Sequence, residues 1–294
     1  MKYHTADLEK VNDGLVQILK MPNDRFRMDI STHPFTTGIA PDDVRITTRY
    51  EGADFKSSMF STLHECGHAI YNLGFGESIR YTPVGDGASF GIHESQSRFW
   101  ENAVGRSMEF TKLVEPLLRK NLPFLAKYDA NGLYLYFNTI RKSFIRVEAD
   151  ELTYNLHTAL RYEIEKKIFT GDVKVSELPE VWNDTFDEFF GMRPPNDAQG
   201  VLQDVHWSWG SMGYFATYTL GNVVLGEIWH KLGDGKSITD AIESGDPAKL
   251  KDWLGQKIHR YGSVYTPKDL QMKAFGEAYN PDRLLDYFEA KFLR

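Results

Sequence analysis

Apolar residues recur along most of this chain with the three-to-four-residue spacing of amphipathic helices. The first such stretch lies near residues 5–20, and its apolar side consists of Leu8, Val11, Leu15, Ile18 and Leu19. Together with capping residues, the same pattern predicts further helices near 56–73, 92–120, 131–170, 179–190, 210–232, 237–243, 247–260, 267–277 and 281–292. The chain is therefore predicted to be mainly helical.

Strand-like sequence is confined to an early part of the chain. Residues 44–50 are rich in β-branched side chains and alternate in polarity, and residues 27–31 are a candidate partner for them. The sequence Gly85-Asp86-Gly87 indicates a turn between two predicted helices. No linker-like segment divides the chain. We therefore expect a single catalytic domain over residues 1–294, mainly α, with a small β-sheet beside the helix predicted for 56–73.

Composition and charge narrow the classes of partner. A chain of 294 residues with 41% hydrophobic residues can bury a full core. Its net charge of −7, with 34 basic residues that form no long run, argues against nucleic acid as the partner. Cys66 is the single cysteine, which excludes an internal disulfide and favours a reducing compartment. With no signal-peptide core and no uninterrupted apolar span, we expect a cytoplasmic protein without a membrane partner.

The first candidate metal-binding and catalytic residues lie in His64-Glu65-Cys66-Gly67-His68. Two histidines four residues apart point to the same side of a helix and can share one metal ion, while the glutamate beside them can polarise a water. This helix is apolar on most sides and is therefore expected to be buried, so that both histidines need partners. We interpret Cys66 as a small core residue, and Gly67 as leaving room for a close approach. The pattern predicts a zinc peptidase.

The third ligand is open at this stage. The longer motif HExxHxxGxxH is absent because Tyr71 and Gly74 occupy its decisive positions. A carboxylate from a later helix is then expected, and Glu94 and Glu101 both qualify, seven residues apart on one face. The alternative for Glu94 is an ion pair with Arg98 at i,i+4 on a solvated face. Two histidines and one glutamate would leave the fourth position open, which is the catalytic arrangement for zinc.

Six groups of residues follow one another in order: His33-Pro34-Phe35, Asp43-Val44-Arg45-Ile46-Thr47, the HExxH at 64–68, His93-Glu94-Ser95-Gln96, Ile145-Arg146-Val147-Glu148-Ala149-Asp150 and Gly200-Val201-Leu202-Gln203-Asp204-Val205-His206-Trp207. This series resembles the motifs of the carboxypeptidase Taq family of zinc metallocarboxypeptidases. The resemblance implies a gluzincin, neurolysin-like helical catalytic region. It also implies that Glu94 is the third zinc ligand and that Glu101 has a supporting or structural role. Cobalt would suit the same ligands.

A carboxypeptidase has to hold the terminal carboxylate of its peptide substrate, and a guanidinium group does this best. Arg146 and Arg45 are the candidates, and Arg49, on the same face of its strand as Arg45, is a weaker one. The alternative for Arg146 is an intrahelical ion pair with Asp150 at i,i+4. The strand predicted for 44–50 could itself serve function, since an extended peptide can pair with an exposed sheet edge beside the HExxH helix.

His206 lies in the last of the six motifs, and the resemblance implies an electrophilic role for it at the developing oxyanion. The alternative is a hydrogen-bonded structural histidine. Related gluzincins place a tyrosine near this point, and Tyr214 and Tyr218 share one face of the following predicted helix. The choice between the two tyrosines stays open, and core packing is an alternative for either.

The resemblance implies hydrolysis of the C-terminal peptide bond of peptides by a zinc-activated water, with Glu65 as general base. Members of the family are longer, so we expect this chain to match only their C-terminal portion. A homodimer, or a second chain, would then supply the missing N-terminal helices. The alternatives are a zinc oligopeptidase or aminopeptidase, and a truncated, non-catalytic metal-binding or interaction protein.

Overall fold

The computed structural model describes residues 4–50 and 54–293, and it divides the chain into two compact units. Unit 1 takes in the chain up to Phe137 and again from Gly221 onward, and unit 2 takes in Asn138–Leu220. A mainly α fold with one small sheet is confirmed. A single catalytic domain over residues 1–294 stays a prediction. Among the described residues, no helix combines the length and the apolar character needed to cross a membrane.

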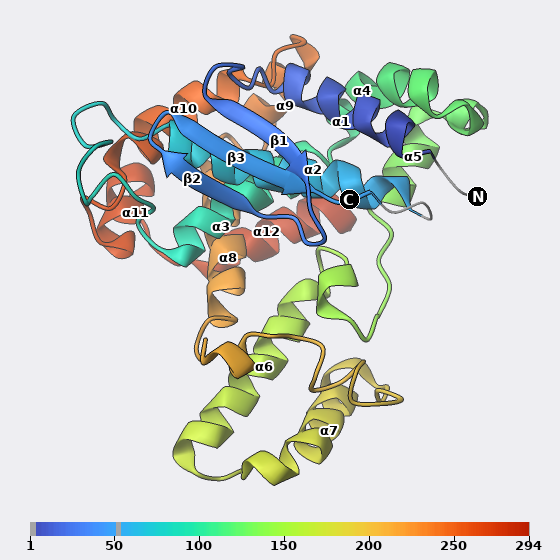
Figure 1. The fold of residues 1–294 in the computed structure, drawn as a ribbon, viewed down its shortest axis with the longest axis vertical. Coiled ribbons are helices and arrows are strands. Elements are labelled where there is room, and N and C mark those ends of the chain that lie inside the picture. The colour runs from blue at the N-terminus through green and yellow to red at the C-terminus, as the bar shows by residue number, and fades with distance from the viewer. Residues whose placement is uncertain (1–3, 51–53, 294) are drawn as a thin grey trace. The chain divides into compact units, whose positions relative to one another are not determined.

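The sheet of unit 1 has three strands, β1 (Phe26–Ile30), β2 (Thr36–Ala40) and β3 (Asp43–Thr48) (Figure 1). β3 is central, parallel to β1 and antiparallel to β2. The predicted pairing of residues 27–31 with 44–50 is therefore confirmed. Strand β2 was not predicted. β3 packs on α2 (Phe55–Leu73) with Val44 and Ile46, which are buried because alternate side chains of a strand face the same side.

Helix α2 is the centre of unit 1. It begins where the Asp54 carboxylate accepts a hydrogen bond from the Lys56 amide, 3.0 Å away, and it ends at Gly74. Cys66 is fully buried in its apolar side, as expected. The other helices of this unit are α1 (Thr5–Ile18), α3 (Phe90–Arg98), α4 (Met108–Asn121), α5 (Ala130–Phe137), α9 (Lys236–Glu243), α10 (Lys249–Lys257), α11 (Pro267–Phe275), α12 (Pro281–Phe292), and, from Gly221 onward, α8 (Ala216–Lys231).

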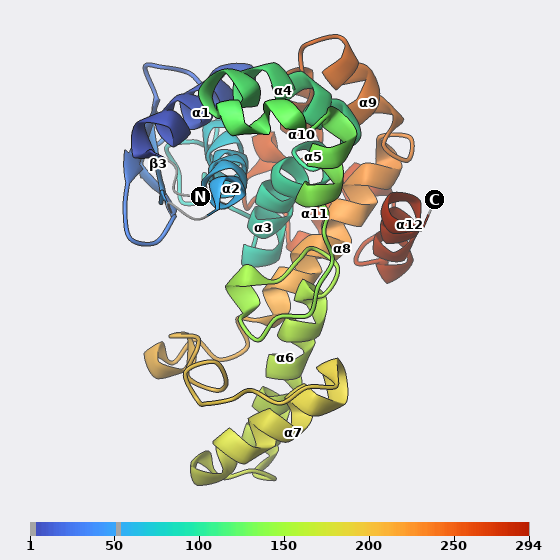
Figure 2. The same ribbon diagram turned by 90° about the vertical axis from the view of Figure 1, so that its right-hand side faces the viewer.

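The predicted helix over 92–120 is wrong as a single element. Helix α3 continues into a π-helical segment, Phe99–Val104, and the helical conformation then ends before α4 begins. Ser107 caps α4 by accepting a hydrogen bond from the amide of Phe110 at 3.1 Å. Helices α2 and α3 lie side by side (Figures 1 and 2), which brings their motifs together.

Unit 2 is built on α6 (Tyr154–Thr170) and α7 (Leu178–Phe190), which pack against each other (Figure 2). Their shared core consists of Leu160, Ile164, Trp182, Phe186 and Phe190. The predicted helix over 131–170 is wrong, because α5 ends at Phe137 and α6 begins only at Tyr154. Asp150 organises the turn before α6 by accepting hydrogen bonds from the amides of Leu152 and Thr153. The helix predicted from residue 210 likewise begins only at Ala216.

Candidate active site

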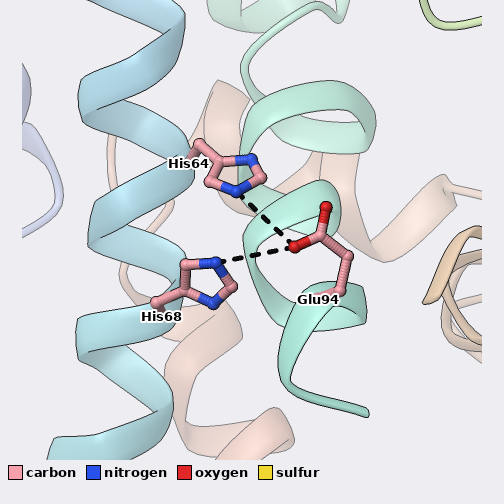
Figure 3. A group of neighbouring side chains, drawn as sticks. All are labelled: His64, His68 and Glu94. Atoms are coloured by element: carbon pink, nitrogen blue, oxygen red, sulfur yellow. Dashed lines mark ion pairs between the residues drawn. The ribbon is translucent and has the colours of Figure 1, made fainter. Parts of the chain in front are cut away.

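Three predicted metal ligands converge in unit 1. His64 and His68 project from one face of α2, and Glu94 faces them from α3 (Figure 3). Glu94 Oε2 lies 3.6 Å from Nε2 of each histidine. The ligand atoms of the three residues lie within 4.8 Å of one another. One nitrogen of each ring and one carboxylate oxygen thus point at a common position.

The spacing and the chemistry of these atoms fit a small divalent cation. Tetrahedral zinc has bonds of about 2.0–2.2 Å, which places its ligand atoms about 3.3–3.6 Å apart. The two separations of 3.6 Å from Glu94 are within a few tenths of an ångström of that value. Two imidazole nitrogens and one carboxylate oxygen are a zinc donor set that leaves a fourth position open.

The hydrogen bonds around His68 leave its Nε2 free for a metal. His93 Nε2 lies 2.9 Å from Asn72 Oδ1, an acceptor, so this nitrogen of His93 is the one that donates. His93 Nδ1 is then an acceptor, 2.6 Å from His68 Nδ1. The same His68 nitrogen is 3.1 Å from the His93 carbonyl oxygen. His68 therefore carries its proton on Nδ1 and presents an unprotonated Nε2 to Glu94.

A carboxylate fixes the other histidine ring. His64 Nδ1 donates to Glu101 Oε2 at 2.9 Å, which orients Nε2 toward Glu94. Glu101 is held in turn by Arg98, at 3.4 Å, and by Arg106, at 2.9 Å. Burial alone would raise the pKa of Glu101, but the two arginines and His64 hold that pKa well below its usual range. Glu101 therefore lies on the Nδ1 side of His64, behind the ring, in the supporting position that the resemblance implied.

The charges around His64 favour a cation. Burial lowers the pKa of His64, but the Glu94 charge and the hydrogen bond to Glu101 outweigh burial and raise this pKa to about 9. For His68 the balance is reversed, because burial and the neighbouring rings of His93 and His64 lower its pKa well below the usual value. A metal ion shared by the two rings would meet the same negative field that stabilises a proton on His64.

Glu94 does pair with Arg98, but not on a solvated face. Arg98 Nε donates to Glu94 Oε1 at 2.9 Å, and both side chains are buried. Because the arginine takes Oε1, Oε2 is left for the histidines. The ion pair and the metal-ligand interpretation are therefore compatible, and the pair orients the ligand.

Two glycines let neighbouring main chains approach α3, the helix that carries Glu94, closely. A Cβ on Gly67 would lie 2.6 Å from Ser97 Cα and 2.7 Å from the carbonyl oxygen of Gln96. A Cβ on Gly221 of α8 would lie 3.0 Å from Cβ and Cγ of Glu94. The close approach expected at Gly67 is thus confirmed, and the approaching group is the main chain of α3.

Glu65 is buried on the side of α2 that faces strand β2. Its Oε2 accepts a hydrogen bond of 2.6 Å from the hydroxyl of Thr36. Burial raises the pKa of Glu65, and the nearby His64 and the Thr36 hydrogen bond oppose that rise. A carboxylate that is buried and only lightly hydrogen-bonded beside the metal ligands suits a general base. Thr36 was missed because strand β2 was not predicted.

The residues of the last two motifs, which include Arg146 and Asp204, lie in unit 2. Asp204 bridges two arginines: its Oδ1 accepts from Arg146 Nη2 at 2.7 Å, and its Oδ2 accepts from Arg161 Nε at 2.7 Å. Arg146 Nη1 also donates to the Tyr154 hydroxyl at 2.7 Å. The alternative ion pair between Arg146 and Asp150 is wrong, since the two residues are not on one helix. Arg161, which the sequence analysis did not single out, is fully buried in this network.

His206, Tyr214 and Tyr218 also lie together in unit 2. The His206 ring centroid is 5.2 Å from that of Tyr214, and His206 Nε2 is 3.4 Å from the Tyr218 hydroxyl oxygen. The Arg146 guanidinium stacks over the Tyr218 ring with 5.0 Å to its centroid. The predicted electrophile, both candidate tyrosines and one candidate carboxylate receptor thus form one cluster. Their roles stay predictions.

Arg45 is not part of the metal cluster. It lies on the face of the sheet away from α2, since its neighbours Val44 and Ile46 are the residues that face α2. Its side chain pairs with Asp43, with Nη2 2.6 Å from Oδ2. Arg49 donates to the Thr32 carbonyl oxygen at 3.2 Å. A role for Arg45 in substrate binding stays a prediction.

Comparison with known proteins identifies the family. The model of the carboxypeptidase Taq (M32) metallopeptidases matches residues 2–292. The chain belongs to this family. The resemblance drawn from six motifs is therefore confirmed, and the match extends over nearly the whole chain.

Several members of the family are similar in both sequence and structure. Thermostable carboxypeptidase 1 of Pyrococcus furiosus is 46% identical over 99% of this chain, and carboxypeptidase 1 of Bacillus subtilis is 42% identical over 90% of it. A solved structure of the Pyrococcus furiosus carboxypeptidase has a TM-score of 0.96 and covers 99% of this chain. Metallocarboxypeptidase 1 of Trypanosoma cruzi has a TM-score of 0.94 at 34% identity and covers 100%.

The chain is shorter than these relatives. It spans 59% of the Pyrococcus furiosus enzyme, 54% of the Bacillus subtilis enzyme and 62% of the Trypanosoma cruzi structure. That the chain matches the C-terminal portion of longer members stays a prediction.

Proposed function

We propose that this chain is a metallocarboxypeptidase, or the metal-binding part of one, which removes the C-terminal residue of peptides. The observation that carries the proposal is the convergence of His64, His68 and Glu94 with the buried carboxylate of Glu65 beside them. Family membership supports the same activity, because the similar curated proteins are carboxypeptidases. Zinc is the metal that we propose, and cobalt is the alternative.

When bound, such a metal supplies a Lewis acid that polarises the scissile carbonyl and acidifies a water. Glu65 takes the proton of the attacking water and delivers it to the leaving amine. Arg98 and Glu101 keep Glu94 and His64 in the orientation that binding requires, so that little reorganisation accompanies the reaction.

We assign the substrate-binding and electrophilic roles from the resemblance. Arg146, with Arg45 as the second candidate, holds the terminal carboxylate of the substrate. His206, together with Tyr214 or Tyr218, stabilises the oxyanion. The cluster of unit 2 supports the first assignment in one respect, because its two buried guanidinium groups share the single carboxylate of Asp204 and leave one positive charge in excess.

The strand that carries Arg45, β3, is central and paired on both sides, so it offers no free edge to a peptide. Strand β2, at one side of the three-stranded sheet (Figure 1), is the proposed peptide-binding edge instead. Its Thr36 side chain contacts the general base. An extended peptide that pairs with such an edge forms main-chain hydrogen bonds regardless of its sequence. This mode suits an exopeptidase that has to accept many different peptides.

Assembly and location complete the proposal. We propose that the chain acts as a homodimer or together with a second chain. Light scattering of the purified protein, alone and with any co-purifying chain, tests this point. A cytoplasmic location stays a prediction from the composition.

The decisive experiment compares two substrates on the zinc-loaded protein. Hydrolysis of an N-blocked dipeptide with a free C-terminus, and no hydrolysis of the same peptide as its C-terminal amide, is the expected result. Cleavage of the amide would instead indicate an oligopeptidase. Glu65→Gln should reduce hydrolysis to a small residual rate while the metal content stays unchanged. A wild-type protein that binds zinc but cleaves neither peptide would refute the enzymatic proposal and favour a non-catalytic metal-binding protein.

A further inference from the structure

We propose that Thr36 is a positioning residue for Glu65: its hydroxyl holds one carboxylate oxygen of the general base and leaves the other free to accept a proton. The proposal rests on the peptidase function proposed above and deepens it. It assigns a role to a strand that carries no metal ligand.

The register of the sheet directs Thr36 toward α2. Thr36 is paired with Ile46 of β3, and directly paired residues of neighbouring strands point to the same face. Ile46 is fully buried on the face that packs against α2, so the Thr36 side chain lies on that face as well. Thr37 is paired with Arg45 and faces the opposite side.

The hydroxyl of Thr36 meets Glu65 at two atoms. Its Oγ1 lies 2.6 Å from Oε2 and 3.2 Å from the carbonyl oxygen of Glu65. A hydroxyl has one proton to donate, and the shorter contact to the charged oxygen is the stronger one. Among the described residues, no other side chain donates a hydrogen bond to this carboxylate. Thr36 is therefore the one observed tether of the base.

A single neutral donor has a specific consequence for catalysis. It restricts the rotation of the glutamate side chain through Oε2 and leaves Oε1 available to accept a proton. Unlike a lysine or an arginine, it adds no opposing charge. Effective general bases must lie within hydrogen-bond reach of the proton that they take, and a loosely held carboxylate meets this condition only part of the time.

The contact also ties the base to the strand proposed to bind the peptide. Thr36 belongs to β2, so the strand that would align the substrate main chain also sets the position of Glu65. Substrate alignment and the position of the base then share one rigid element. This differs from the role of Glu101, which acts on a metal ligand.

Three substitutions test the proposal. Thr36→Val removes the hydroxyl but keeps the β-branched shape, and Thr36→Ser keeps the hydroxyl. Thr239→Val on α9, away from the proposed site, is the matched control. For Thr36→Val we expect kcat to fall about ten- to hundredfold, the range for losing a hydrogen bond to a charged group. KM and zinc affinity should stay within about twofold, because the base acts in the transition state and binds no metal. Thr36→Ser and Thr239→Val should retain most of the wild-type rate.

A double-mutant cycle separates positioning from general damage. In a Glu65→Gln background the base is already lost, so Thr36→Val should cause almost no further fall in the residual rate. A second readout uses metal-free protein with ¹³C-labelled glutamate carboxyl groups. The Glu65 resonance is identified as the one that disappears in Glu65→Gln. Thr36→Val should shift this resonance at constant pH, whereas Thr239→Val should leave it unchanged.

The outcomes are distinct. The proposal is wrong if Thr36→Ser loses as much activity as Thr36→Val, if the loss is equally large in the Glu65→Gln background, or if zinc affinity falls instead of kcat. An unshifted Glu65 resonance in Thr36→Val overturns it as well. If the wild-type protein itself cleaves no peptide, the peptidase proposal fails, and the carbon resonance still decides whether Thr36 holds Glu65.

Discussion

Gly67→Ala is the substitution that most directly tests how the two helices create the metal site. The added methyl group would lie 2.6 Å from Ser97 Cα and 2.7 Å from the Gln96 carbonyl oxygen. Both of these are main-chain atoms, so a change of rotamer cannot relieve the clash. To restore ordinary contact, α3 has to move away from α2 by about 0.8–1 Å.

Such a shift is large compared with the tolerance of a metal site. Glu94 is carried by α3 and lies 3.6 Å from Nε2 of both His64 and His68. A displacement of about 1 Å exceeds the variation of about 0.2 Å that is normal for ligand distances, so the carboxylate can no longer complete the site. We expect zinc affinity to fall more than about a hundredfold, beyond the effect of losing an outer hydrogen-bond partner. Overpacking should also cost about 1–3 kcal/mol of stability.

The assay is competition with a zinc chelator on the folded protein, with thermal unfolding of the metal-free protein beside it. Gly255→Ala on α10 is the matched control, because a Cβ there meets no atom within 4 Å. This control should bind zinc normally and gain about 0.5–1 kcal/mol, as expected for alanine in place of a helical glycine. If Gly67→Ala binds zinc as tightly as the wild type, the close main-chain approach does not position Glu94, and the argument fails.

Two further predictions concern single side chains. Glu101→Gln should weaken zinc binding about 10- to 100-fold, because an amide orients His64 less firmly than a carboxylate does. Chelator competition measures this, Glu115→Gln on α4 is the control, and unchanged affinity would contradict the supporting role of Glu101. His157→Phe should reduce acid sensitivity. Burial lowers the pKa of His157 to about 3, so below pH 6.5 the unfolded chain binds one more proton than the folded one. As the pH falls from 6.5 to 3, this residue should therefore cost the wild type about 1.4 kcal/mol of unfolding free energy per pH unit. Urea titrations at several pH values measure the unfolding free energy, and in the variant that free energy should decrease less steeply as the pH falls.

The sequence predicted the candidate site best where the interacting residues lie close together along the chain. Two histidines four residues apart on one helix lie together whatever the rest of the fold does, so His64 and His68 could be paired from spacing alone. The choice of Glu94 over Glu101 needed the family resemblance. The structure shows why spacing could not decide it, since both carboxylates contact His64, one on each side of its ring.

The features that were missed depend on partners distant in sequence. Arg146 was predicted to lie within a helix, but its guanidinium is held by Asp204, which lies 58 residues later. Strand β2 is only five residues long and contains a glycine, so its place in the sheet is decided by pairing with β3. The contact between Thr36 and Glu65 could not be predicted without that pairing.

The two glycine contacts at α3 have a consequence for ion selectivity. Because Gly67 and Gly221 bring neighbouring main chains against the helix that carries Glu94, the gap between the ligands cannot widen through side-chain repacking alone. Such a site should select its ion by the kind and number of ligands. Zinc and cobalt accept two imidazole nitrogens and one carboxylate oxygen. Calcium needs six to eight oxygen ligands, and a site that cannot widen has no means of adding them, so calcium should be rejected. This preference would then depend in part on two residues that have no side chain.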